Sequence, residues 1–333
     1  ETLNGAMFYL QGYAIFISVC QLNWAQRKYL CSMVCGFGLL NVLFIIFGIN
    51  ISVLTNNILD ENEVAFGLFR NANHASVFLC LNVLLFFGVF ANKVRSTGDK
   101  RIVIYFLYSI VFSMYGFGVY LCGSRAGFIL FAFAVMLIGL FIILRRAAGA
   151  RKLRVLLITV FLSLGSVTIV LFFETAAFNG FLFDVVRWGY FEDTFRAIVD
   201  FFPHGSGIGS FEKIYPMYEP MSSFSDVYIR HAHNDWLEVI LEGGIIAIIA
   251  LAFGIAWWVK GVTYYWGLVI RSNSREPGDL PLHCVASIGV GLLFLHSFVD
   301  FPLRTGGLII VFGLLAGLMV EPPVRLVSKN LGR

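Results

Sequence analysis

The chain has 333 residues, of which 59% are hydrophobic and only 13% are charged, and its mean hydropathy is +0.82. A soluble core does not need that much apolar surface, so the composition excludes a soluble globular protein and indicates a polytopic membrane protein. The net charge of +4 says little by itself, because the information lies in where the charges fall along the chain.

Hydropathy predicts about nine membrane spans, roughly at 6–24, 29–50, 73–92, 102–122, 124–144, 155–173, 236–259, 283–300 and 306–320. Placing alternate connections in the cytoplasm leaves seven of the 24 basic residues outside, namely Arg70, Arg125, Arg187, Arg196, Lys213, Arg230 and Arg304. The positive-inside rule supports this topology, with Glu1 outside and the C-terminus inside. We therefore expect an all-α bundle in three parts: N-terminal transmembrane helices over 1–173, an outer loop over 174–234, and C-terminal transmembrane helices over 235–333.

The remaining polar groups are distributed unevenly between the two sides of this topology. Every histidine except His283 falls on the outer side, together with most of the acidic residues. The six cysteines lie in or at the ends of apolar runs and contain no Cys-x-x-Cys pair, so we expect buried free thiols and neither disulfides nor zinc. The outer face is where we expect the functional site.

The most informative stretch runs from residue 228 to 247. Nine residues separate His233-Asn234 from Gly244, and Ala247 stands three positions after Gly244. Here the chain resembles the O-antigen ligase and polymerase superfamily of bacterial membrane glycosyltransferases, whose signature is His-(Asn/Ser/Gln)-x9-Gly-x-x-Gly. The last position departs from the signature, but alanine keeps that site small. Because superfamily members usually carry more spans, the resemblance implies further helices before Glu1.

Two arginines extend the resemblance upstream. Arg125 lies in Gly123-Ser-Arg-Ala-Gly127 between two spans, where a charge should face a cavity or a carboxylate, although its side chain could also extend to the outer interface. The resemblance implies that Arg125 is essential and that the second essential arginine is Arg187, with Arg196 as the alternative. Arg196 could instead pair with Glu192 one helical turn before it.

Two further segments resemble recurring superfamily elements. In Phe69-Arg-Asn-Ala-Asn-His74, either asparagine could cap the following helix, or Asn73 and His74 could help shape the site. In the second segment, 296–304, His296 and Asp300 stand four residues apart, and we expect a mutual hydrogen bond rather than direct chemistry. Arg304 could supply another positive contact to substrate.

The spacing around the signature predicts two helices. Residues 184–200 have helical apolar spacing and could lie along the membrane surface, before a flexible Gly-rich turn at 203–211. Asp235, Glu238 and Glu242 fall on one face of the next helix, where Asp235 and Glu238 could form a capping box. A carboxylate nearly two turns into a span is disfavoured, so we expect Glu242 to pair with an arginine, with Arg125 as the candidate.

The outer groups suit a lipid diphosphate, because arginines and a helix N-terminus both favour phosphate oxygens. The resemblance implies an undecaprenyl-diphosphate-linked glycan as donor, with His233 as general base and Arg125 and Arg187 stabilising the diphosphate. We expect substrate contacts from Asn73, His74, Arg196, His231, Asn234, Asp235, Glu242 and Arg304, with His231 as second choice for the base. No Asp-x-Asp motif occurs, so we expect neither a metal nor another cofactor, and no nucleic-acid partner.

The acceptor stays open at this point. An O-antigen ligase would move the glycan onto lipid A–core in lipopolysaccharide biosynthesis, a polymerase would extend it on its carrier, and a protein O-oligosaccharyltransferase would use Ser or Thr. All three imply a multi-pass protein of the bacterial inner membrane with a periplasmic site. A transporter of lipid-linked sugars is the alternative from another class, but we find no internal repeat or paired broken helices.

Overall fold

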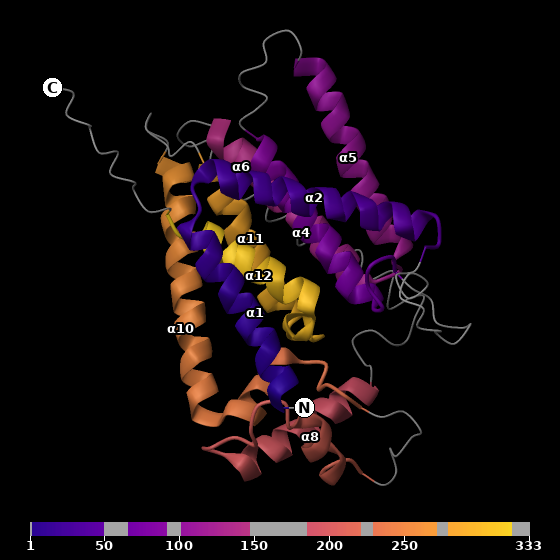
Figure 1. The fold of residues 1–333 in the computed structure, drawn as a ribbon, viewed down its shortest axis with the longest axis vertical. Coiled ribbons are helices and arrows are strands. Elements are labelled where there is room, and N and C mark those ends of the chain that lie inside the picture. Colours follow the sequence, from indigo (N-terminus) through magenta and orange to yellow (C-terminus); the bar gives the residue numbers. More distant parts are fainter. Residues whose placement is uncertain are drawn as a thin grey trace, which may run out of the picture.

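The structure is a computed structural model that describes residues 2–49, 66–91, 101–146, 185–220, 229–271 and 279–321. These residues form helices joined by turns, and the extended pairing among them is one isolated bridge between Phe66 and Phe69 (Figure 1). The helices are α1 (Thr2–Gln21), α2 (Trp24–Ile46), α4 (Ala72–Phe90), α5 (Arg101–Leu121), α6 (Arg125–Arg146), α8 (Val185–Phe201), α9 (Phe211–Ile214), η3 (Tyr215–Met217), α10 (Asp235–Arg271), α11 (Leu280–His296), η5 (Pro302–Arg304) and α12 (Gly306–Leu318). The predicted all-α fold is confirmed for this part of the chain.

Four of the described helices, α2, α4, α6 and α10, are long and apolar enough to cross a membrane. Four shorter apolar helices accompany them, within α1, α5, α11 and α12. Each expected span coincides with one of these helices except 155–173, which lies outside the described residues. The chain is therefore a multi-pass membrane protein, and the count of nine spans stays a prediction.

Helices α4 and α11 form the centre of the bundle. α4 packs against α2, α5, α6 and α11, and α11 in turn packs against α10 and α12. α1 packs closely along α12, with Gly313 facing Gly12. A Cβ atom on Gly313 would lie only 2.3 Å from the carbonyl oxygen of Gly12, so only glycine allows this approach. The start of α4 and the end of α11 meet at one end of the bundle, the end that the sequence predicts to face outward and that is called the outer end below, so residues there are held by two deeply buried helices.

At the opposite end, Arg27 fastens α1 to α12. Its side chain is fully buried and donates to the carbonyl oxygens of Cys20 and Leu22 at the end of α1, and of Gly317 and Val320 at the end of α12. A cation beneath two helix C-termini satisfies carbonyls that lack helical partners and opposes the negative end of each dipole. Arg27 thus fixes one end of the α1–α12 pair, the end that the sequence predicts to face the cytoplasm.

Helix α10 is bent at Gly244, whose φ of 55° and ψ of −137° are not helical. A Cβ atom there would lie 2.1 Å from the carbonyl oxygen of Pro203, so only glycine fits both the backbone conformation and the space. Hydrogen bonds from Ser206 N to Leu241 O and from Ile245 N to Pro203 O hold the Gly-rich turn against the bend. The expected span at 236–259 is therefore a short outer helix followed by the membrane helix proper (Figure 1).

Helix α8 and the Gly-rich turn cover the outer end of the bundle, at the bottom of Figure 1 near the start of α1. A small separate core holds this cap together, and it consists of Ala197, Phe211, Tyr215, Ala232 and Leu241. Because Ala232 precedes His233 and Leu241 belongs to α10, the cap is packed directly onto the signature segment. The flexible turn predicted at 203–211 is instead ordered by its bonds to α10.

Candidate active site

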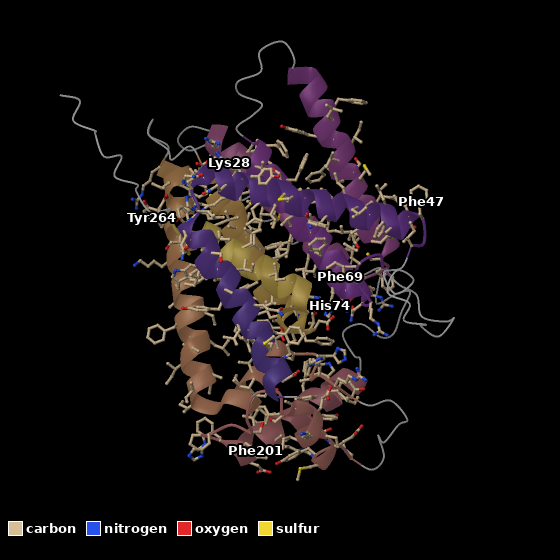
Figure 2. All side chains as sticks on the ribbon, in the orientation of Figure 1. Lys28, Phe47, Phe69, His74, Phe201 and Tyr264 are labelled. Carbon is tan, nitrogen blue, oxygen red and sulfur yellow. The ribbon has the colours of Figure 1, made fainter. Side chains whose placement is uncertain are left out.

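Four segments that are distant in sequence meet at the outer end of the bundle. They are the start of α4, the start of α6, the segment 229–235 before α10, and the turn 297–305 between α11 and α12. Hydrogen bonds between polar side chains join all four segments, and the label of His74 in Figure 2 marks their position.

His233 is the only residue other than glycine with a positive φ in the described part of the chain, at 51°. That backbone conformation costs about 1–2 kcal/mol for a residue with a Cβ, and such strain is retained mainly at functional sites. The flanking backbone is fixed, because Ala232 N donates to the Glu238 carboxylate and Asp235 N donates to Ser297 O. The strained conformation therefore has a firm frame on either side.

The His233 side chain is 31% exposed, so one edge of the ring is open to a ligand. Its Nδ1 lies 3.5 Å from Oδ1 of Asp300. The ring lies between two aromatic rings, Tyr190 at a centroid distance of 6.1 Å and Phe301 at 5.2 Å. These neighbours leave the Nε2 edge as the one that can face substrate.

Asp300 is fully buried at the centre of three histidines. Its carboxylate accepts hydrogen bonds from Phe301 N and Asn73 Nδ2, and ring nitrogens of His74 and His296 each lie 3.8 Å away. Burial alone would raise the pKa of Asp300, but the close approach of His233, the charges of His74 and His296 and the hydrogen bond from Asn73 outweigh it, so the pKa lies below its usual value. The expected hydrogen bond between His296 and Asp300 does not form, since Nε2 of His296 lies 3.8 Å from the Oδ2 atom that accepts from Asn73.

Asn73 connects this carboxylate to the start of α6. Its Nδ2 donates to Asp300 at 2.7 Å, and its Oδ1 accepts from the Ser124 hydroxyl, also at 2.7 Å. Asn71 is the residue that caps α4, since its side chain accepts from the backbone N–H groups of Asn73 and His74. Of the two alternatives for this segment, the asparagines therefore divide the roles: Asn71 caps the helix and Asn73 braces the site.

His74 is also held at this position. Its Nδ1 lies 3.0 Å from the Thr305 hydroxyl, and its ring makes an edge contact with Phe301 at 5.0 Å. The His74 side chain is only 6% exposed, and its predicted contact with substrate stays a prediction. His74 thus packs beside Asp300 and hydrogen-bonds Thr305.

Arg304 contacts all three carboxylates in the first part of α10. Its guanidinium lies 3.6 Å from Asp235, 3.1 Å from Glu238 and 3.0 Å from Glu242, and all four side chains are at most 7% exposed. Burial alone lowers the pKa of Arg304, but the carboxylates, Glu238 above all, reverse this and raise the pKa above its usual value. The predicted single face of carboxylates is confirmed, and it faces a cation.

Two expectations about this helix start are wrong. The arginine that pairs with Glu242 is Arg304 and not Arg125, because the bend at Gly244 keeps Glu242 at the outer end beside the turn 297–305. Asp235 does not cap the helix either: Asn234 does, by accepting from Leu237 N at 3.1 Å. Asp235 instead accepts from the Ser297 hydroxyl and from Leu303 N, so it binds α10 to the turn.

His231 occupies the position next to Glu238. Its Nδ1 lies 3.0 Å from Glu238 Oε1, and its ring lies over Phe301 at a centroid distance of 4.2 Å. The side chain is 29% exposed, close to the value for His233. The two histidines are thus equally open but face different carboxylates, Glu238 with its arginine and Asp300 with its histidines.

The remaining predicted arginines differ in how far the structure places them. Arg125 is the first residue of α6 and half-buried, directly after the Ser124 that bonds Asn73. The side chain of Arg187 lies outside the described residues. Arg196 pairs with Glu192 and Asp193 on its own helix, as the i, i+4 spacing suggested, and its side chain is 58% exposed.

Sequence reasoning left Asp300, Ser124 and Tyr190 out of the site. The first two had a signal, because Asp300 stands four residues after His296 and Ser124 adjoins Arg125 in the glycine-flanked motif. Tyr190 had none, since its contact with His233 depends on how α8 folds back over the segment before α10.

One comparison with known proteins bears on this arrangement. The family model described as O-antigen ligase matches residues 110–252, a range that includes Arg125, Arg187, His233 and Gly244. No curated protein matches the chain. The match coincides with the signature segment and both arginine motifs, and it confirms the resemblance drawn from them. The match over residues 110–252 supports a relation to the O-antigen ligase and polymerase superfamily, whose members are glycosyltransferase-like membrane enzymes.

Proposed function

We propose that this protein transfers a glycan from undecaprenyl diphosphate to an acceptor hydroxyl, and that it is an O-antigen ligase acting on lipid A–core at the periplasmic face of the inner membrane. The observation that carries the proposal is the pairing of His233, the signature histidine, with the buried carboxylate of Asp300. A histidine whose Nδ1 faces a carboxylate keeps its other nitrogen available to accept a proton.

The proposed step is an inverting displacement. The acceptor oxygen forms a bond to the anomeric carbon while the bond from that carbon to the diphosphate oxygen breaks. The proton of the acceptor hydroxyl passes to Nε2 of His233, and undecaprenyl diphosphate leaves with the bonding electron pair. General base catalysis of this kind contributes about 10²–10⁴-fold in rate. Asp300 acts through His233 as a positioning residue, because it orients the ring and opposes the charge that develops on it.

Stabilisation of the departing diphosphate falls to Arg125 and Arg187 in this proposal, as the superfamily resemblance implies. Arg125 lies beside Ser124, which the Asn73 link connects to Asp300, and this supports its place near the reacting groups. Arg304 is a poor candidate for a direct contact, because three carboxylates already surround its guanidinium. We therefore assign Arg304 to holding the site together, in place of the positive substrate contact expected from the sequence.

The test is reconstitution of the purified protein with an undecaprenyl-diphosphate-linked glycan and lipid A–core, with products separated on a gel. Glycan on lipid A–core supports the ligase. Longer glycan that remains on the carrier lipid would show a polymerase instead. If neither product forms, the same donor with a Ser- and Thr-containing acceptor protein tests the oligosaccharyltransferase, and flux of the donor across sealed vesicles tests the transporter.

A further inference from the structure

Helix α8 carries three kinds of surface along its length. One side is buried in the cap core, where Asp193, Thr194 and Ala197 are at most 5% exposed. A second side is charged and exposed, with Glu192 and Arg196 paired to each other. The third side is apolar and exposed. A helix between protein and water needs only the first two, so the apolar side requires an explanation.

The α8 apolar face consists of Trp188, Phe195, Val199 and, directly after the helix, Phe202, which are 50–60% exposed. Their spacing of i, i+7, i+11 and i+14 keeps all four on one side of the helix. Large apolar side chains grouped in this way mark a surface that lipid or another protein covers.

This face continues into the membrane-facing side of α10. The bond from Ile245 N to Pro203 O places Phe202 beside the start of the membrane helix, where Ile245 and Ile246 are 40% and 75% exposed. Ile249 and Phe253, at 51% and 74%, extend the same exposed apolar surface along α10. The apolar surface of α8 therefore joins the surface that a bilayer must cover.

We infer that the α8 apolar face is inserted in the outer leaflet of the lipid bilayer, so that α8 lies in the interface as an in-plane helix. The bilayer is the occupant because the face is continuous with a membrane helix and is bordered by charged residues that can stay in water. This gives the helix predicted along the membrane surface a defined lipid side, and it does not depend on the proposed reaction.

An in-plane α8 also fixes the depth of the site. α8 is packed on Ala232, and its Tyr190 ring lies nearly parallel to His233 at 6.1 Å. A helix fixed at the level of the lipid headgroups therefore holds the signature histidine near that same level. The phosphate groups of membrane lipids occupy the same region. The bilayer surface that covers α8 thus sets the position of His233 along the membrane normal.

The chain offers a matched pair of positions for the test. Phe195 and Arg196 are adjacent and equally exposed, at 59% and 58%, but they belong to the apolar and the charged side. Nitroxide labels on Phe195→Cys and Arg196→Cys, in a Cys20→Ser background and one protein per lipid nanodisc, are compared by power-saturation spectroscopy. The reagents are oxygen, which partitions into lipid, and a water-soluble nickel chelate. The five other cysteines are buried.

The expected result is an oxygen-to-nickel accessibility ratio several-fold higher at position 195 than at position 196. Equal ratios would place the face in water and overturn the inference. A label at 195 that neither reagent reaches would overturn it too, because protein, either another segment or a second copy, would then cover the face. Val199→Cys, 60% exposed on the same side, replaces Phe195→Cys if that variant does not fold.

Discussion

Replacing Arg304 by methionine should destabilise the protein without first affecting substrate binding. The guanidinium lies within 3.6 Å of three carboxylates that are 1–4% exposed, so its removal leaves buried negative charge without a partner. Breaking a buried ion pair from one side costs about 3–5 kcal/mol. At roughly 2 °C per kcal/mol for a large chain, Tm should fall by about 6 °C or more. Thermal unfolding in nanodiscs, followed by tryptophan fluorescence, measures this directly.

A matched control separates buried from exposed pairing. Arg196→Met removes a charge pair of which both members are more than half exposed, so its cost should stay within about 1 kcal/mol. Combining Arg304→Met with Glu238→Gln and Glu242→Gln should recover part of the lost Tm, because the charges left unpaired are removed. The reasoning is refuted if Arg304→Met unfolds like the wild type and instead raises the KM for donor, as a substrate contact would.

Four other predictions concern Asp300, the bend at Gly244 and the role of metal ions. Asp300→Asn should lower kcat by roughly 10²–10⁴-fold with little change in donor KM, measured by steady-state transfer, because the His233 ring loses its orienting carboxylate. Since the pKa of Asp300 lies below the usual value of about 4, the stability lost in Asp300→Asn should be constant above that pH and shrink below it in thermal melts. Gly244→Ala should lower the free energy of unfolding by at least about 1–3 kcal/mol through backbone strain. Ala247→Gly, which restores the superfamily signature, should lower it by about 1 kcal/mol or less. A similar Tm for the two variants would contradict the bend. Transfer should survive EDTA, and loss of turnover that a divalent cation restores would overturn metal independence.

Local patterns predicted what depends on a single helix. The 3.6-residue period places Asp235, Glu238 and Glu242 on one face, and the i, i+4 spacing pairs Glu192 with Arg196; both are confirmed. These features need only the geometry of one element, so sequence spacing is sufficient for them. Composition alone was likewise sufficient for the all-helical membrane fold.

Features that depend on contacts between distant segments were missed. The partner of Glu242 is 62 residues away in a turn whose path cannot be read from hydropathy. The bend at Gly244 moved that carboxylate from the expected depth in a span to the outer end, and the reason is a backbone contact with Pro203. The i, i+4 spacing predicts only His296 as a partner of Asp300. In the structure, the ends of three helices bring His74, His233 and His296 close to this carboxylate.

The most direct test of the central claim compares two histidines that are equally exposed in the same segment. His233→Gln and His231→Gln are assayed for single-turnover glycan transfer from a radiolabelled donor, with donor binding and Tm measured on the same samples. We predict that His233→Gln binds donor, unfolds like the wild type and transfers roughly 10²–10⁴-fold more slowly, while His231→Gln retains most of the rate. Equal rates for the two variants, or a slow step only in His231→Gln, would contradict His233 as the general base.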